Sequence, residues 1–172
     1  MPKTITHGLK LAGCEAEIDR FADEVGGLGA KLGPVLVQLP PSLAFDAALA
    51  IAFFTRLGET FTGATVCEPR HPSWFDPQAD ALLAAHRIAR VAADPALVPD
   101  AALPGGWRGL AYFRLHGSPR IYRSGYEPEA RALWAERVRP HAADTPVWVM
   151  FDNTASGRAT EDALALVGDI GA

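Results

Sequence analysis

Residues 66–74, VCEPRHPSW, place a carboxylate, a guanidinium, an imidazole and an indole within seven positions, at Glu68, Arg70, His71 and Trp74. An apolar run ends and proline begins here, which is typical of a strand that terminates in a polar site. Since strand residues two apart share a face, Glu68 and Arg70 are expected to point the same way, with His71 on the turn beyond. Two interpretations are open: a functional site, or a buried ion pair that closes the strand.

Polar side chains also follow the other predicted strands. They are Gln38, Asp94, Arg114, His116, Asp152 and Asn153. In a parallel α/β fold the carboxyl ends of the strands lie along one edge, where ligands bind both in barrels and in open sheets. The alternative, that strand ends meet loops and loops are polar, stays open for any single residue.

This edge could support acid–base chemistry on an anion. Glu68 beside Arg70 is expected to stay ionised, because a nearby cation favours the carboxylate. Arg114 disfavours an imidazolium at His116, and a neutral His116 could act as a general base or a metal ligand. The candidate catalytic residues are Glu68, Asp94, His116 and Asp152, and the candidate substrate-binding residues are Gln38, Arg70, His71, Trp74, Arg114, Tyr122, Tyr126 and Asn153.

Several assignments at this edge keep an alternative. A divalent metal is left open, because ligands from separate strands leave no spacing signature and neither HxH nor HExxH occurs. The loop over residues 116–126 interleaves arginines with tyrosines, so it could clamp an anion and stack on a ring, or be a solvated loop whose tyrosines pack on the rim. Trp74 is either a stacking wall or a packing residue. Cys67 has the opposite parity to Glu68, so it is expected to face the helices and is rejected as a nucleophile.

Composition indicates one soluble globular domain. The 172 residues are 49% apolar and 21% charged, with a net charge of −4. The acidity disfavours nucleic acid as a partner, so any anion has to be bound by a local cluster. Two cysteines without a disulfide framework, no signal-like segment and no apolar run of membrane-spanning length predict a reduced, cytoplasmic protein with no membrane association.

Hydrophobic patterning predicts short strands alternating with helices. The predicted strands cover residues 35–39, 63–68, 90–94, 110–117 and 147–153, and the predicted helices cover residues 15–28, 46–57, 76–87, 128–138 and 156–167. The glycine-rich segment 26–33 follows a helix and precedes a strand, the reverse of a nucleotide-binding loop, so it is a connector. Strands that are apolar on both faces and alternate with helices predict a parallel α/β sheet covered by helices.

Seven motifs, in order, give the chain a family resemblance. They are ITH at 5–7, LGPVLVQLPP at 32–41, CEPRHPSW at 67–74, AAD at 92–94, YFRLHG at 112–117, WA at 134–135 and VMFDNT at 149–154. On these motifs the chain resembles the YecE-like family, domain of unknown function 72, over almost its whole length. The resemblance implies a TIM-barrel-like fold in a single domain.

The resemblance also implies that the barrel is partial. Family members begin with further βα units, including a GTSGW-type first strand, and ITH is an internal stretch in them. The chain is therefore expected to hold the last five of the eight βα units of a (β/α)8 barrel. A late start codon, a gene fragment or a chain that pairs with another copy would each explain this. Strands 35–39 and 147–151 would then have unpaired edges that invite self-association.

Three functions remain open on this basis. The first is an enzyme that acts on a small or oligomeric anionic substrate, with phosphoester hydrolysis, with or without a metal, as its concrete form. The second is a non-catalytic module that binds a small ligand or nucleic acid in the same pocket. The third is an inactive fragment of a longer parent protein.

Overall fold

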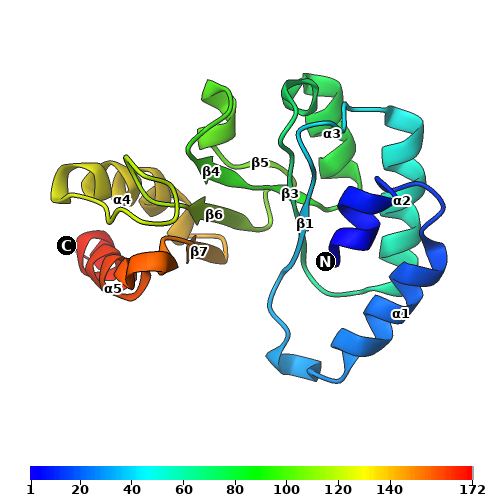
Figure 1. Cartoon of the computed structure of the whole chain (residues 1–172), viewed down its shortest axis with the longest axis horizontal. Coiled ribbons are helices and arrows are strands. Elements are labelled where there is room, and N and C mark those ends of the chain that lie inside the picture. Colours follow the sequence, from blue (N-terminus) through cyan, green and yellow to red (C-terminus); the bar gives the residue numbers. More distant parts are fainter. Residues whose placement is uncertain (172) are drawn as a thin grey trace.

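A computed structural model describes residues 1–171, which form a mixed α/β fold in which strands and helices alternate (Figure 1). The strands are β1 Val35–Gln38, β2 Thr65–Glu68, β3 Ala89–Arg90, β4 Ala92–Asp94, β5 Gly105–Gly106, β6 Ala111–Leu115 and β7 Val147–Phe151, and the helices are α1 Glu15–Gly26, α2 Ala47–Thr60, α3 Pro77–Ala85, α4 Pro128–Ala142 and α5 Arg158–Gly171. Short helical turns are η1 Thr4–Gly8, η2 Gly29–Lys31, η3 Pro72–Phe75, η4 Pro99–Ala102 and η5 Thr154–Ser156. All the predicted helices and strands are confirmed apart from shifts at their ends and one interruption.

The interruption divides the sheet. Residues 90–94, predicted as one strand, form β3 and β4, which belong to different sheets with the orders β1-β2-β3-β5 and β4-β6-β7. The prediction of a single sheet is therefore wrong. At the break, the Val91 amide still donates to the Cys67 carbonyl of β2, at 2.9 Å, while β4 turns to pair with β6. Pairing along β1-β2-β3 and along β4-β6-β7 is parallel, as expected.

Strand β5 was not predicted, and it pairs with β3 in the antiparallel direction. Two glycines do not predict a strand from sequence, but here their lack of a side chain lets β5 lie close to Arg90 and Ile88. A Cβ on Gly105 would lie 2.2 Å from the Arg90 guanidinium, and Gly106 has a φ of +60° in the left-handed region that favours glycine. The close approach therefore explains the residue type, although patterning could not reveal the strand.

Capping residues begin the helices that flank the predicted site strands. The Asp46 carboxylate accepts from the Leu49 amide at 2.9 Å at the start of α2. Asp76 accepts from the Gln78 amide at 2.8 Å, and Pro77 occupies the first position of α3. None of the helices within residues 1–171 is both long and apolar enough to cross a membrane.

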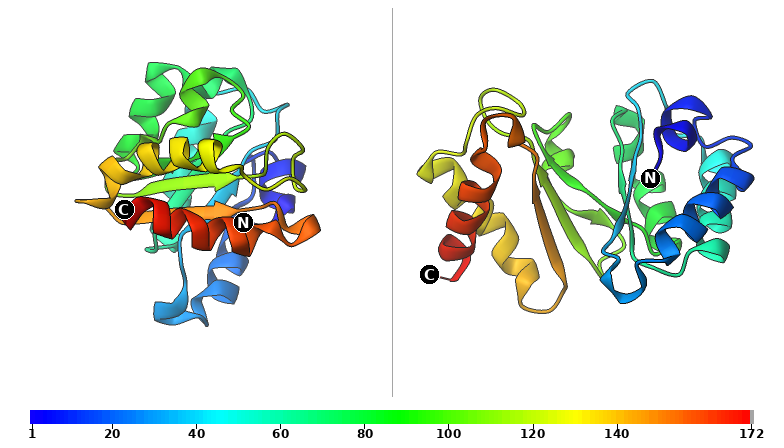
Figure 2. Two further views of the ribbon diagram at one scale, coloured as in Figure 1. Left: turned by 90° about the vertical axis from the view of Figure 1, so that its left-hand side faces the viewer. Right: turned by 60° about the horizontal axis from the view of Figure 1, so that its bottom comes forward.

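The two sheets diverge like the sides of a V, with the helices on the outside (Figure 2, right). Alternate residues of β1 and β2, among them Val37 and Cys67, pack in the core formed with α1, α2 and α3. In β6 and β7 the outward residues pack in a second core with α4 and α5. The opposite residues of each strand face the inside of the V, where Trp148 and Met150 of β7 stay exposed.

We expect Asp80→Ala to lower the free energy of unfolding by about 2 kcal/mol. Asp80 accepts from Arg90 Nε at 3.1 Å and from the buried Gly106 amide at 2.7 Å, so its loss leaves two buried donors without this acceptor. The measurement is urea unfolding, with Asp144→Ala as the control, because Asp144 is exposed and lies in a turn. Equal unfolding midpoints for the two variants would show that the hydrogen bonds of Asp80 to Arg90 and Gly106 do not stabilise the fold.

Candidate functional site at the carboxyl ends of the strands

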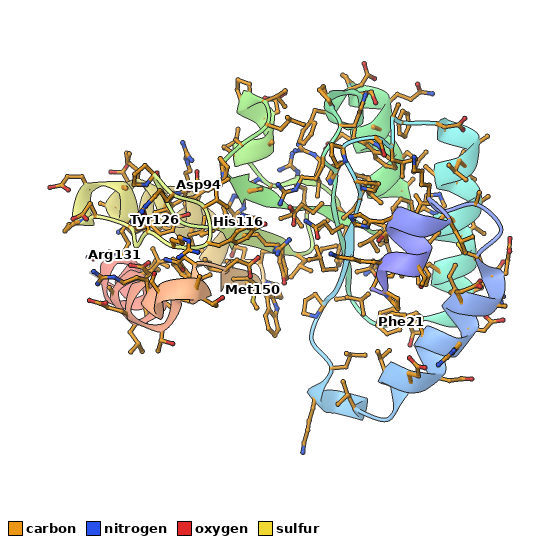
Figure 3. All side chains as sticks on the ribbon, viewed as in Figure 1. Phe21, Asp94, His116, Tyr126, Arg131 and Met150 are labelled. Carbon is orange, nitrogen blue, oxygen red and sulfur yellow. The ribbon has the colours of Figure 1, made fainter. Side chains whose placement is uncertain are left out.

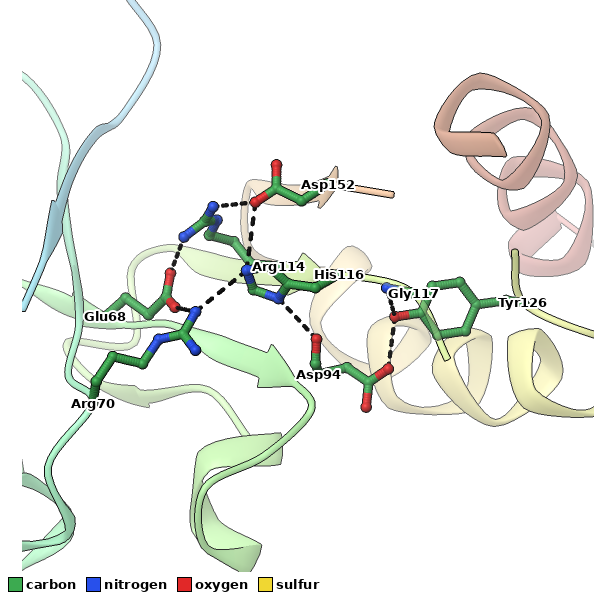
Figure 4. Close-up of polar contacts among 8 residues, drawn as sticks. All are labelled: Glu68, Arg70, Asp94, Arg114, His116, Gly117, Tyr126 and Asp152. Carbon is green, nitrogen blue, oxygen red and sulfur yellow. Dashed lines mark hydrogen bonds and ion pairs between the residues drawn. The ribbon is translucent and has the colours of Figure 1, made fainter. Parts of the chain in front are cut away.

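A network of charged side chains joins the two sheets at the carboxyl ends of their strands (Figure 4). Glu68, at the end of β2, is 1% exposed and forms ion pairs with Arg70 and with Arg114 of β6. Arg114 also pairs with Asp152, which follows β7. The structure thus brings together four residues that the sequence placed on three separate strand ends, and their two positive and two negative charges balance.

His116 contacts Arg70 and is assigned as the neutral tautomer protonated on Nδ1. The His116 Nδ1 atom is 2.8 Å from the Asp94 carbonyl oxygen, which can only accept, so Nδ1 carries the proton. Arg70 Nη2 lies 3.3 Å from Nε2 and can only donate, so Nε2 offers its lone pair. Asp152 Oδ2 is 3.4 Å from the same Nε2 atom. Nε2 therefore has a cationic donor on one side and a carboxylate on the other.

The Asp94 side chain turns away from this network. Its Oδ2 accepts from the Tyr126 hydroxyl at 2.6 Å, and the same hydroxyl accepts from the Gly117 amide at 2.9 Å. Figure 3 shows Asp94, His116 and Tyr126 close together within the whole molecule. Asp94 thus orients His116 through its backbone carbonyl, and its carboxylate is not aimed at the ion-pair network as a catalytic group would be.

The carboxylates around Arg114 keep it charged. Burial disfavours the charged guanidinium of Arg114, but the carboxylates of Glu68 and Asp152 outweigh burial and raise the pKa of Arg114. Glu68 Oε1 forms its ion pair with Nη2 of Arg70, whereas the buried Nε of Arg70 has no hydrogen-bond partner within residues 1–171. Arg70 is thus less completely paired than Arg114, both of whose terminal nitrogens meet carboxylates.

A hollow of about 510 Å³ opens above Arg70. Its polar lining comes from His7, Gln38, Arg70 and Tyr122, and its apolar lining comes from Leu39, Pro41, Pro95, Ala96 and Leu97. These residues belong to η1, to the last position of β1 and to the segments that follow β1, β2, β4 and β6. Of the predicted site residues, Gln38, Arg70 and Tyr122 line the hollow, while Glu68, Arg114, His116 and Asp152 form the layer that carries Arg70.

Sequence reasoning missed His7 and the apolar wall. His7 lies in the ITH motif, so the signal was present, but a histidine on a short helical turn has no partner in sequence that points to a site. Pro95 and Leu97 lie just after β4, but they are apolar, so the search for polar side chains at strand ends did not include them. Loop residues carry no periodicity, which is why only their position after a strand could have indicated them.

Four predicted residues do not line the hollow, so their placement gives no support to the expectation that they contact substrate. Trp74 is 1% exposed, and its indole nitrogen donates to the Leu43 carbonyl at 3.0 Å, so it is a packing residue. His71 accepts from the Ser73 amide at 3.2 Å and caps η3. Asn153 is fully buried and donates to Ser124 and Asp162. The Tyr126 hydroxyl is engaged by Asp94 and Gly117, as described above.

Metal-ligating clusters and the Cys67 thiol are the remaining candidates for chemistry. Among residues 1–171, no three His, Cys, Asp or Glu side chains cluster closely enough to hold a metal ion. Cys67 faces the helix core, as predicted, and burial followed by the nearby Glu68 charge raises the pKa of its thiol. A thiol of this kind is a poor nucleophile.

Comparison with known proteins places the fold among proteins of unassigned function. The chain matches the sequence profile described as "Protein of unknown function DUF72" over residues 1–172. It is similar to a DUF72 family protein from Thermotoga maritima MSB8, with 23% identity and a TM-score of 0.82 over 99% of this chain and 72% of that one. It is also similar to a DUF72 family protein from Enterococcus faecalis V583, with 22% identity and a TM-score of 0.76 over 94% of this chain and 67% of that one. These identities show a shared fold alone, and no curated protein matches the chain.

We expect Tyr126→Phe to lower the free energy of unfolding by about 2 kcal/mol, because it leaves the buried Gly117 amide and Asp94 Oδ2 without a partner. Tyr122→Phe is the matched control, since the Tyr122 side chain is half exposed and its hydroxyl has no hydrogen-bond partner within residues 1–171. Chemical denaturation of both variants gives the difference. If the two variants lose the same stability, Tyr126 does not hold the Asp94–His116 unit.

Alkaline pH should destabilise the fold through its buried phenols. Burial raises the pKa of Tyr112, and burial with the hydrogen bond to Asp94 raises the pKa of Tyr126. Above the ordinary value of 10.0 the unfolded chain loses these protons and the folded chain keeps them, so stability falls as pH rises. Each group contributes a slope of about 1.4 kcal/mol per pH unit. Unfolding measured across this range should show a shallower slope in Tyr126→Phe, whereas parallel curves would contradict the account.

Proposed function

Since this chain belongs to the family described as protein of unknown function DUF72, its function has to be inferred from the site, and we propose that it binds a small anionic molecule through Arg70 and acts on it as an enzyme. The observation that carries the proposal is the position of Arg70. It is the one permanently charged residue in the lining of the hollow, and Glu68 holds it in place from below. Preorganised guanidinium groups are favoured binding partners of phosphate and carboxylate.

Arg70 has binding capacity left over. Within residues 1–171 its polar contacts all involve Nη2, which meets Glu68 and His116. Nε is buried and has no hydrogen-bond partner among these residues, and no contact of Nη1 with them is found. An anion in the hollow can therefore bind Nη1, a donor that residues 1–171 do not use. Arg114 cannot serve in the same way, because both of its terminal nitrogens are paired with carboxylates.

The bound anion also changes the environment of His116. Arg70 Nη2 donates to His116 Nε2 in the ligand-free protein, so an anion that draws the guanidinium toward the hollow frees the lone pair of Nε2. Asp152 Oδ2, at 3.4 Å, is placed to stabilise the imidazolium once Nε2 takes a proton. His116 is thereby suited to general-base catalysis that begins when substrate binds.

Ester hydrolysis is the concrete form of this chemistry. Nε2 takes a proton from a water molecule, and the water oxygen forms a bond to the phosphorus of a phosphoester that Arg70 holds, or to the ester carbonyl carbon of a substrate whose separate carboxylate Arg70 holds. The bond from that atom to the ester alcohol oxygen breaks, and the imidazolium gives its proton to the leaving alkoxide. Asp94 keeps Nδ1 protonated throughout, since its carbonyl accepts from Nδ1.

We also propose that the fold is part of a (β/α)8 barrel. The strand succession β1-β2-β3 and β4-β6-β7 follows the chain order, the pairing is parallel, and the helices lie on one side of each sheet. In such barrels, ligands bind at the carboxyl ends of the strands. The position of the hollow at those ends supports this proposal.

A non-catalytic binding module is the second candidate. His116 is 1% exposed and is covered by Arg70, so the base of the proposed reaction is not open to solvent in the ligand-free protein. In this version Arg70 binds the same anion, and the buried network serves only to hold Arg70 in place.

Turnover of a chromogenic phosphate ester and a carboxylate ester tests the enzymatic proposal. We expect His116→Asn to reduce turnover by about 10²-fold or more, since the amide can still donate to the Asp94 carbonyl but cannot take up a proton. Arg123→Gln, on the exposed loop, is the control and should leave turnover unchanged. Anion binding with equally slow hydrolysis in wild type and His116→Asn would overturn the enzymatic proposal in favour of the binding module.

A further inference from the structure

The hollow above Arg70 combines one cation with an apolar wall. Leu97 is 49% exposed and Tyr122 is 52% exposed, and both line it together with Pro41, Pro95 and Ala96. Single exposed apolar side chains are common on protein surfaces and indicate nothing. Several that line one concave surface are typical of a binding site. Within residues 1–171, no carboxylate lines the hollow. The wall therefore suits an apolar part of a ligand, and Arg70 suits its charge.

The backbone of Tyr122 is fixed in an unusual conformation. Its φ of +67° lies in the left-handed region, which non-glycine residues rarely adopt. The Tyr122 amide donates to the His116 carbonyl, and its own carbonyl accepts from the Ala155 amide at 3.0 Å. Backbone strain that the surrounding structure enforces is concentrated at functional sites. Tyr122 is thus held at the rim, whereas a solvated loop residue would be free to relax.

The ring of Tyr122 packs against His116 and lines the hollow. Its centroid is 5.7 Å from that of His116, with the two rings at 75° to each other. More than half of the side chain is nevertheless exposed, so Tyr122 offers an unpartnered aromatic surface beside the hollow. Aromatic rings gain more from another planar ring than from an aliphatic group of the same area, through offset or edge-to-face contact.

We infer that the ligand of the hollow is an aromatic or heteroaromatic anion, whose ring packs on Tyr122 and Leu97 while its phosphate or carboxylate binds Arg70. The inference rests on the proposed function, because it assumes that Arg70 binds the anion. Gln38 contributes to specificity: its side-chain amide lines the hollow and has no hydrogen-bond partner within residues 1–171, so it can bond a polar atom on the ring. A volume of about 510 Å³ falls within the range of about 300–1,000 Å³ that small-molecule pockets occupy.

Calorimetry with matched probes tests this inference. The probes are phenyl phosphate and benzoate, which carry a ring, and inorganic phosphate and acetate, which do not. We expect each ring-bearing probe to bind about tenfold more tightly than its ring-free partner. Tyr122→Ala should abolish this preference, while Tyr122→Phe should keep it. Ile121→Ala is the control, because Ile121 is the exposed neighbour that does not line the hollow.

The outcomes separate this inference from the function on which it rests. Anions that bind through Arg70, with affinity lost in Arg70→Gln but without preference for a ring, would overturn the inference and leave the proposed function standing. A ring preference that survives in Tyr122→Ala would overturn it as well. If no probe binds and Arg70→Gln changes nothing, both fall. The tighter of phenyl phosphate and benzoate identifies the anionic group.

Discussion

A buried carboxylate has to be ion-paired or hydrogen-bonded, and the most buried carboxylate within residues 1–171 is that of Glu68. Its side chain is almost completely removed from water, where an uncompensated charge is strongly unfavourable. The partners come from either side: Arg70, two residues further along the same segment, and Arg114, from the second sheet. Because Asp152 then pairs with Arg114, the requirement at one residue fixes side chains from three strand ends. These ion pairs thus connect the two sheets of the V at the carboxyl ends of their strands.

The ion-pair network positions the groups on its two sides, His116 on one side and the hollow lined by Arg70 on the other. Below, His116 is oriented through the Asp94 carbonyl, which Tyr126 in turn holds through the carboxylate of Asp94. Above, Arg70 is the only member of the network that lines the hollow, with a donor, Nη1, that residues 1–171 do not use. In the proposed mechanism a substrate meets Arg70 first and His116 only after Arg70 moves. That proposal requires this order, because His116 is buried in the ligand-free protein.

The sequence predicts the network better than it predicts the hollow. Parity along a strand places Glu68 and Arg70 on one face, and the convergence of parallel strands brings Arg114, His116 and Asp152 to them, so residue type and period suffice. The break at Val91 has no local signal, because it arises where one segment pairs with two sheets. Trp74 shows a different limit: a sequence cannot tell whether an indole faces a ligand or finds a carbonyl such as that of Leu43 inside the core. His7, Leu97 and Pro41 reach the hollow from loops and a helical turn, whose paths depend on the completed fold.

We propose that Arg70 binds the anion and that this contact releases His116. A crystal structure of the protein grown with phenyl phosphate would show both events. We expect the phosphate on Arg70 within the hollow, the guanidinium drawn away from His116 Nε2, and the ion pair between Arg114 and Asp152 intact. An empty hollow with Arg70 still on His116, or a phosphate bound to the exposed arginines of the 118–125 loop instead, would contradict it.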